Sequence, residues 1–291
     1  MSDRMVKINN PSLEKQSNDH FHHLGITKSA IDIPKTYGDV KFICMGGSMT
    51  RMKNYAEIFA RETGISISNN VSTTDRYVMY KTGPVLWVNH GIGVPSISII
   101  IVELIKLLYY AKAKDVIAIR MGTSGGVGAA AGVVVISNGG MNGELLDKHV
   151  QYIVGQKILR PAIFDAEVYQ QLYKVALELK IPAQIGKTLC TDDFYEGQAR
   201  LDGAFCEYTE QQKFSFLNRL HELGVRNIEM EALCFASMFN RGNIKAAIVC
   251  VTLLDRLKSD QILLEHGDLD KFEMRVFKVV STYIKQQLKL C

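Results

Sequence analysis

One short segment of the chain combines three residue types that can hold an anion. In VIAIRMGTSGGVGAAAG, residues 116–132, an apolar run ends in Arg120, and glycines with Thr123 and Ser124 follow at once. Glycine has no Cβ, so backbone N–H groups can approach a bound anion closely there. Arginine adds a planar, permanently charged group that suits phosphate. The segment therefore predicts phosphate contacts at the end of a buried strand.

A second segment has the same composition. CMGGSMTRM, residues 44–52, runs from an apolar strand through glycines, including Gly47, to Ser48, Thr50 and Arg51. Ligands of open α/β sheets bind at strand ends, so two such loops could hold one phosphate from both sides. A single loop of this kind is most simply an ordinary glycine turn with a surface arginine. The presence of two favours a phosphate site.

The first segment also matches two better-known motifs. GTSGG, residues 122–126, fits the G-x-S-x-G nucleophile elbow of α/β-hydrolases, and GVGAAAG, residues 126–132, imitates a dinucleotide-binding fingerprint. Both motifs require a helix directly after the loop. Here the β-branched run GVVVIS, residues 132–137, follows instead. We therefore expect neither a serine hydrolase nor a dinucleotide site.

Apolar runs of strand length alternate with helical patterns along the chain, which predicts an α/β fold around a mixed sheet. We expect residues 1–20 to form a flexible arm and residues 21–291 a single domain. The expected strands are 40–45, 76–81 and 84–90 (a hairpin), 115–121, 132–137, 183–191 and 245–254, and a short strand runs into a helix within 226–239. The expected helices are 54–64, 95–114 (apolar nearly all round and therefore expected to be buried), 166–180, 207–222 and 269–289, with a polar loop at 192–203.

Composition narrows the class of protein. Of 291 residues, 47% are hydrophobic and the net charge is only +4, without a basic block that could follow a nucleic acid backbone. The polar N-terminus has no signal-peptide pattern, and the longest apolar segment, 96–111, contains Glu103 and Lys106. We therefore expect a cytoplasmic protein that binds neither nucleic acid nor membrane. The scattered cysteines are typical of reduced core thiols. The histidines at 20, 22 and 23 are more typical of a surface cluster than of a metal site.

Several long motifs resemble the animal uridine phosphorylases, which have the nucleoside phosphorylase-I fold. They are GGSMTRMK, TDRYVMYKTGPVLWVNHGIGVPSISI, IRMGTSGGVG, CTDDFYEGQARLDGAFCEYTE and GVRNIEMEALCFA, and the similarity runs from about His23 to Leu264. The resemblance implies a barrel-like mixed sheet flanked by helices. It also implies a pentosyltransferase of pyrimidine salvage, which cleaves uridine, and more weakly deoxyuridine or thymidine, with phosphate to give uracil and ribose 1-phosphate. It implies no metal or organic cofactor, and a homodimer.

The same resemblance assigns roles to individual residues. The implied catalytic residues are Arg120, Gln198, Arg200 and Glu231. Phosphate would contact Gly47, Arg51, Arg120 and Thr123, with Arg76 from the partner subunit. Ribose would contact Glu231 and Met230, with His23 from the partner subunit, and uracil would contact Gln198, Arg200, Phe194, Leu253 and Leu254. The remaining expected substrate-binding residues are Ser124, Gly125 and Arg256.

The chemistry makes these residue types reasonable. Phosphate itself is the nucleophile, so no serine or cysteine nucleophile is required, and a guanidinium binds phosphate without protonating it. Gln198 and Arg200 would stabilise negative charge on the departing uracil, and Glu231 can accept hydrogen bonds from two ribose hydroxyls. Each residue taken singly has a structural explanation, such as a first-turn acid favoured by the helix dipole for Glu231 or a loop ion pair between Arg200 and Glu196.

One position leaves two alternatives open. Asp255 stands before Arg256 where uridine phosphorylases commonly have Asn, and purine-cleaving relatives use an aspartate there as a proton donor. We favour a loop acid paired with Arg256, because Gln198 and Arg200 are typical of pyrimidine recognition. A purine or broad-specificity phosphorylase and a non-catalytic nucleoside-binding paralogue are the alternative functions.

Overall fold

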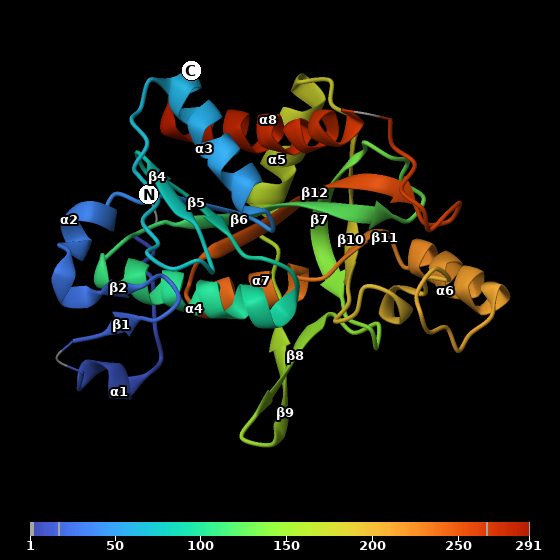
Figure 1. Ribbon diagram of the computed structural model, residues 1–291, viewed down its shortest axis with the longest axis horizontal. Coiled ribbons are helices and arrows are strands. Elements are labelled where there is room, and N and C mark those ends of the chain that lie inside the picture. The colour runs from blue at the N-terminus through green and yellow to red at the C-terminus, as the bar shows by residue number, and fades with distance from the viewer. Residues whose placement is uncertain (1–2, 17, 266, 291) are drawn as a thin grey trace. The chain divides into compact units, whose positions relative to one another are not determined.

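The computed structural model describes residues 3–16, 18–265 and 267–290 (Figure 1). Within these residues the chain forms two compact units. Unit 1 contains the chain up to Ile119 and residues 238–246, and unit 2 contains residues 120–237 and 247–289. Strand β6 (Ile117–Gly126), helix α7 (Ala232–Arg241) and strand β12 (Lys245–Asp255) have residues in both units. The units are therefore not successive segments of the chain.

Unit 1 has a small mixed sheet covered by a helix. Strand β3 (Phe42–Gly46) pairs in parallel with β5 (Val85–Asn89), and β4 (Met79–Thr82) pairs with β5 in antiparallel register. This confirms the expected hairpin, which is shorter than the sequence suggested. Helix α3 (Met49–Thr63) packs on these strands. The remaining elements of unit 1 are α1 (Pro11–Glu14), β1 (His20–Phe21), β2 (Ile26–Thr27), a 3-10 turn at Lys28–Ala30, α2 (Ile33–Tyr37) and α4 (Gly93–Tyr110).

Helix α3 begins earlier than the sequence pattern predicted. Ser48 caps it, because its hydroxyl accepts a hydrogen bond from the backbone N–H of Arg51 at 3.3 Å. Gly64, with φ of 70°, ends it. The loop expected at residues 46–52 is therefore short, and Arg51 lies in the first turn of a helix.

Helix α4 is buried on one side only. Its length and mean hydropathy would suit a membrane span, but 44% of it is buried within the structure. Ile97, Ile100 and Leu104 are inaccessible, whereas Val102 is 45% exposed. The helix is therefore buried as expected on one side and exposed on the flank that carries Val102.

The predicted flexible arm contacts unit 1. Val6 is buried, the backbone N–H of Lys7 donates to Gly242 O, and Asp115 N–H donates to Arg4 O. Asp19 is also buried: Lys106 Nζ and the Tyr110 hydroxyl donate to its carboxylate at 2.8 and 2.9 Å. Backbone hydrogen bonds and charged contacts therefore hold the described part of this segment on unit 1. Amino-acid composition alone does not reveal such contacts. Residues 1–2 and 17 of the predicted arm lie outside the described residues.

Unit 2 contains a closed mixed sheet. Its strands follow the order β11, β10, β7, β12 and β6, and β11 also pairs with β6, which closes the sheet. The β10 pairs with β7 and β11 are parallel, while β12–β7 and β11–β6 are antiparallel. This confirms the barrel-like mixed sheet. The strands are β6, β7 (Val134–Met141), β10 (Ala183–Cys190), β11 (Val225–Glu229) and β12.

Three helices of unit 2 lie where the sequence placed helical patterns. Helix α6 (Glu210–Glu222) packs on β11, and helix α5 (Ala166–Glu178) lies beside α8 (Asp268–Leu288) (Figure 1). Leu217 and Leu220 of α6 are fully buried, and burial of a leucine contributes roughly 1.5–3 kcal/mol. A hairpin of β8 (Lys148–Ile153) and β9 (Gln156–Pro161), which the sequence analysis missed, extends from this unit.

The glycine-rich segment after Arg120 is a strand and not the predicted loop. Residues 122–126 continue β6, and Gly125 and Gly126 pair with Ile228 and Asn227 of β11. A Cβ on Gly126 would lie 2.1 Å from Ala129 O, so only glycine fits there. Strand β7 follows with no helix between the two, which confirms that neither the hydrolase elbow nor the dinucleotide fingerprint is present.

A buried chain of hydrogen bonds joins four of these strands. The Ser137 and Thr188 hydroxyls lie 2.6 Å apart, Thr188 Oγ1 donates to Asn227 Oδ1 at 2.8 Å, and Asn227 Nδ2 donates to Ser124 Oγ at 3.1 Å. Buried polar groups that are fully paired fix one arrangement of a core. This series of hydrogen bonds therefore holds β11 against β6, where the sheet closes.

The Asp19 contacts predict a pH dependence of stability. Burial alone would raise the pKa of Asp19, but the hydrogen bonds from Lys106 and Tyr110 bring it below its ordinary value of 3.8. As the pH falls, Asp19 is therefore protonated at a higher pH in the unfolded chain than in the folded chain. The contribution of its ionised carboxylate to folding stability is complete above about pH 4 and is lost as the pH falls further. We expect Asp19→Asn to lower the free energy of unfolding at pH 7 by about 1–3 kcal/mol.

Urea unfolding between pH 2 and pH 7 measures this effect, with Asp39→Asn, at a half-exposed aspartate, as the control. The difference between wild type and Asp19→Asn should shrink as the pH falls below about 4. A difference that is constant with pH would contradict the assignment.

Candidate functional site

The arginine from which the sequence analysis began lies buried in unit 2 between two carboxylates. Arg120 is 4% exposed. Its Nη2 pairs with Glu231 Oε2 and lies 3.1 Å from Glu229 Oε2, and Nη1 donates to the Cys250 thiol at 2.9 Å. Nε has no hydrogen-bond partner among the described residues. Arg120 is thus buried rather than open to solvent, but one donor stays available.

Glu229 holds both the arginine and the next helix. Its carboxylate accepts hydrogen bonds from the backbone N–H groups of Glu231 and Ala232 at 3.0 and 2.9 Å, so it caps the start of α7. Glu231 lies two residues after the end of β11 and directly before α7, and its carbonyl accepts from Phe235 N–H in the first turn of α7. The side chain that caps α7 is therefore that of Glu229, which the sequence did not single out. Glu231, for which the sequence left open the role of a first-turn acid favoured by the helix dipole, lies directly before that turn.

The charges of this cluster shift one another's pKa values. Burial raises the pKa of Glu229 above its ordinary range, and the nearby Arg120 opposes that rise. Burial alone would lower the pKa of Arg120, but the surrounding Glu229, Cys250 and Glu231 raise it further above an already high value. The guanidinium therefore stays charged, as an anion-binding group must.

The hydroxyl and glycine residues after Arg120 alternate along β6. Thr123 and Gly125 are partly exposed, while Ser124 is buried. Ser124 Oγ donates to Val251 O at 3.3 Å and accepts from Asn227. Successive side chains of a strand point to opposite faces, so Thr123 and Ser124 cannot both face one ligand through their side chains. The structure gives Ser124 an internal role, and Thr123 is the better placed of the two for a ligand.

Gln198 and Arg200, the predicted readers of uracil, are both buried in unit 2. The Gln198 side-chain amide has no hydrogen-bond partner among the described residues. Arg200 binds Asp202 through Nε and Nη2 at 2.8 and 2.6 Å and lies 4.7 Å from the centre of the Phe194 ring. Arg200 lowers the pKa of Asp202. Its loop partner is thus Asp202 and not Glu196, the partner that the sequence analysis considered.

The end of β12 lies beside these residues. Arg256 is fully buried, its Nη2 donates to Gln198 O at 2.7 Å, and its Nη1 has no hydrogen-bond partner among the described residues. A Cβ on Gly125 would lie 3.0 Å from Arg256 Cγ and 3.8 Å from Leu254 Cδ2. The structure therefore brings the predicted residues Gly125, Gln198, Leu254 and Arg256 together. Phe194 is 44% exposed, Leu254 is buried, and Leu253 and Met230 are partly exposed.

Four of the predicted residues belong to unit 1. Gly47 lies where β3 leads into α3, and a Cβ there would lie 3.0 Å from Gly91 O. Arg51 is partly exposed in the first turn of α3. Arg76 is exposed beside Asp75, and His23 Nδ1 lies 2.9 Å from Glu103 Oε1. Their proposed roles toward a ligand stay predictions.

Asp255 serves the local backbone. Its Oδ1 accepts hydrogen bonds from the N–H groups of Gly128 at 3.1 Å and Leu257 at 3.2 Å, and Lys258 Nζ lies 3.9 Å from Oδ2. It makes no ion pair with Arg256, whose carboxylate partner is Asp260. The expected loop role is therefore correct, but the expected partner is wrong.

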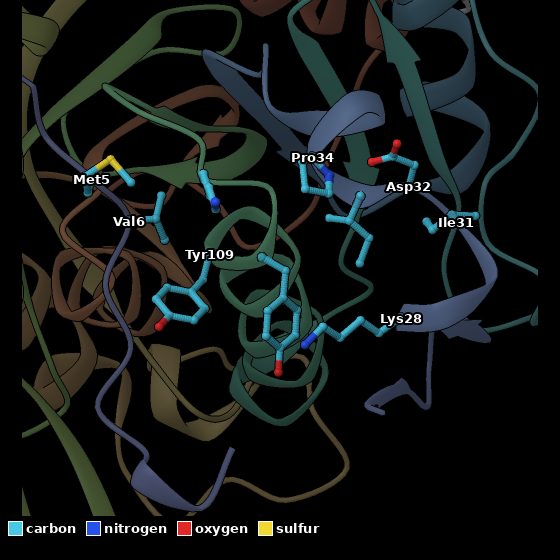
Figure 2. A pocket seen from close by; sticks show the side chains of 10 residues that line it. Met5, Val6, Lys28, Ile31, Asp32, Pro34 and Tyr109 are labelled. Atoms are coloured by element: carbon cyan, nitrogen blue, oxygen red, sulfur yellow. The ribbon is translucent and has the colours of Figure 1, made fainter. Parts of the chain in front are cut away.

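Unit 1 also has a cavity of about 570 Å³ near the N-terminal segment (Figure 2). Met5, Val6, Ile31 and Tyr109 give it a largely apolar wall, and Lys28 lies at its edge. None of the predicted site residues lines it. Its chemistry does not fit the predicted phosphate site.

Metal binding has no obvious place in the described chain. No group of three or more His, Cys, Asp or Glu side chains there is arranged to hold an ion. In the histidine cluster, the rings of His20 and His22 lie 5.0 Å apart, and His20 Nδ1 lies 2.9 Å from the Thr27 hydroxyl.

Comparison with known proteins agrees with this fold. Residues 41–285 match the phosphorylase superfamily. A Caenorhabditis elegans protein named uridine and thymidine phosphorylase is 50% identical, over 94% of this chain and 92% of its own. The crystal structure of uridine phosphorylase from Schistosoma mansoni in complex with thymidine has a TM-score of 0.94 and 36% identity, covering 97% of this chain and 99% of its own.

A further relative has a different name. Inactive uridine phosphorylase B of Schistosoma mansoni is 36% identical over 96% of both chains. Membership of the family thus does not by itself establish catalysis. The matches confirm the resemblance found in the sequence: the chain belongs to the phosphorylase superfamily and, within it, to the uridine phosphorylase family.

The contacts of Asp255 predict how it tolerates substitution. Asp255→Ala removes the acceptor of two backbone N–H groups, so we expect the free energy of unfolding to fall by about 1 kcal/mol or somewhat more. Asp255→Asn keeps an acceptor oxygen and should stay within about 0.5 kcal/mol of wild type. Urea unfolding of the three proteins measures both changes. Equal destabilisation by Asn and Ala would show that the charge, and not the acceptor, matters.

Proposed function

We propose that this chain catalyses reversible phosphorolysis of uridine to uracil and ribose 1-phosphate, with deoxyuridine and thymidine as weaker substrates. The observation that carries the proposal is the arrangement in unit 2. Buried Arg120 lies on β6, and its two carboxylate partners lie at the end of β11 and two residues beyond it. Gln198, Gly125 and Arg256 come together beside Leu254. Relatives named for uridine and thymidine support the choice of a pyrimidine nucleoside.

The proposed mechanism needs only phosphate, nucleoside and the chain's own residues. A phosphate oxygen attacks the anomeric carbon of the ribose as the C–N glycosidic bond breaks, and the bonding electron pair leaves with uracil. Arg120 would turn donors, including the unpartnered Nε, toward the phosphate. Glu231 would exchange its contact with Arg120 for the ribose hydroxyls.

The base side would stabilise the departing uracil. The Gln198 amide can both donate and accept, which matches the alternating N–H and C=O groups on the edge of a pyrimidine. Arg200 uses Nε and Nη2 for Asp202, which leaves Nη1 for the ring. Donors directed at developing negative charge are worth about 2.7–4 kcal/mol each in known enzymes. We propose no metal or organic cofactor for these steps.

A phosphate-dependent assay with uridine, thymidine, inosine and adenosine tests this proposal. We expect uridine to be cleaved fastest, and only when phosphate is present. Faster cleavage of inosine would favour a purine phosphorylase. Binding of uracil without any turnover would favour a non-catalytic paralogue, which the inactive relative makes a real second candidate.

Arg120→Lys tests the phosphate role. Lysine keeps a cation between Glu229 and Glu231, so the fold should survive, whereas an apolar residue would leave two buried carboxylates unpaired. It cannot reproduce the planar arrangement of guanidinium donors, so we expect kcat to fall roughly 100-fold or more. Steady-state kinetics with varied phosphate measure this, with Arg219→Lys on the surface of α6 as control. Unchanged kinetics would exclude Arg120 as the phosphate ligand.

Gln198→Leu tests the base role. Leucine has nearly the same size but no amide, so the KM for uridine should rise roughly tenfold while the KM for phosphate hardly changes. Kinetics with each substrate varied in turn separate the two effects. An equal rise in both KM values would contradict the assignment of Gln198 to the base.

We further propose a homodimer in which Arg76 and His23 act at the partner's site. Arg76 is exposed and pairs only loosely with Asp75, at 3.8 Å. Mixed dimers of one Arg76→Ala subunit and one Gln198→Leu subunit would contain one intact site. We expect their activity to exceed that of either parent, as measured after subunit exchange. Activity no higher than the parents' would place Arg76 in its own subunit's site or outside any site.

A further inference from the structure

A buried lysine on helix α6 has no part in the proposed reaction. Lys213 is 4% exposed, and its Nζ lies 2.7 Å from Asp260 Oδ2. Its Nζ also lies 5.2 Å from the centre of the Phe214 ring. Lysine is rarely buried so completely, because the ammonium group loses its hydration. Burying the ammonium group costs hydration free energy, so we expect a role for Lys213 in addition to packing.

Asp260 connects this lysine to both arginines of the base side. Its Oδ1 accepts from Arg256 Nε at 2.9 Å, and its Oδ2 accepts from the backbone N–H of Leu201 at 2.9 Å. Its backbone carbonyl accepts from Arg200 Nη2 at 2.7 Å. The residue therefore ties together α6, the segment after Gln198 and the segment after β12.

The contacts continue to the predicted base reader. Arg256 uses its Nη2 to hold the backbone carbonyl of Gln198, and the Tyr208 hydroxyl, just before α6, donates to the carbonyl of Arg200. The charged groups in contact with this cluster are Lys213, Asp260, Arg256, Arg200 and Asp202. Hydrogen bonds to ionised groups are shorter and stronger than those between neutral groups, so the cluster can fix a loop that has little regular structure.

We propose that Lys213 and Asp260 are positioning residues that set the orientation of Gln198 and Arg200 toward the polar edge of the pyrimidine ring. This inference rests on the proposed function. Lys213 acts through Asp260, and Asp260 acts through Arg256 and Arg200. Precise placement of ligand-contacting groups commonly depends on such outer hydrogen-bond partners.

Lys213→Met tests the proposal. Methionine keeps much of the length of the lysine side chain but removes the cation that pairs with Asp260. We expect the KM for uridine and the Kd for uracil, the latter measured by calorimetry, to rise roughly 10- to 100-fold. The KM for phosphate should stay within about twofold, because Lys213 has no contact with the Arg120 cluster. Lys258→Met, at an exposed lysine near the same loop, is the matched control and should change neither value.

Two further variants keep the test decisive if Lys213→Met is poorly folded. Asp260→Asn keeps an acceptor but removes the charge, and should weaken uracil binding while leaving phosphate kinetics unchanged. Lys213→Arg retains a cation for Asp260 and should recover a large part of the affinity for uracil. A purely structural role would lower the melting temperature of these variants without separating uracil from phosphate.

Two results would overturn the proposal. One is a folded variant whose uracil and phosphate constants both match wild type, and the other is an equal loss of both. These results can be told apart from a failure of the proposed function. If the proposed function were wrong, the wild-type protein itself would not cleave uridine in the presence of phosphate. Wild-type cleavage with unaffected Lys213 and Asp260 variants would reject this inference alone.

Discussion

The burial of the Arg120 guanidinium is the constraint on which the site of unit 2 depends. An arginine cannot lose its proton at ordinary pH, so its burial requires anionic partners in good geometry. Glu229 and Glu231 provide two carboxylates for one guanidinium, which leaves an excess of negative charge. Glu229 offsets part of that excess by accepting two backbone N–H groups at the start of α7. The helix start, the strand end and the arginine are therefore fixed by one set of contacts. In the proposed reaction, Glu231 is the carboxylate that exchanges its contact with Arg120 for the ribose hydroxyls.

The closure of the sheet brings these groups together. Arg120 is on β6 and the two carboxylates are at the end of β11, and these strands pair directly through Gly125, Gly126, Asn227 and Ile228. Asn227 strengthens that short pairing by donating to Ser124 and accepting from Thr188. The glycines are needed because a Cβ at Gly126 would collide with the backbone. The glycine-rich composition that suggested a phosphate loop thus has a structural cause in strand closure, which does not conflict with a ligand at the adjacent Thr123.

The sequence predicted much of this arrangement where the signal was local. β-branched runs identified β12, helical periodicity identified α5 and α8, and long motifs identified the family. It failed where the cause is a distant partner. Residues 122–126 look like a loop because of their glycines. They belong to a strand because β6 pairs with β12 and, at Gly125 and Gly126, with β11, and both partners lie about a hundred residues or more later in the chain. The choice of Asp202 over Glu196 as partner of Arg200 depends on the path of the loop. Lys213 gave no signal in the sequence, because a lysine on a helix is normally exposed.

Two aspartates near the end of β12 show why residue type alone does not define a role. Asp255 and Asp260 are five positions apart, and the first stands where purine-cleaving relatives carry a proton donor. In the structure Asp255 accepts backbone N–H groups, whereas Asp260 joins the cations of Lys213 and Arg256. Oδ1 of Asp255 is thus occupied by two backbone donors of its own segment. The structure therefore gives Asp255 a local backbone role, so an aspartate at this position is not by itself a reason to expect a purine substrate.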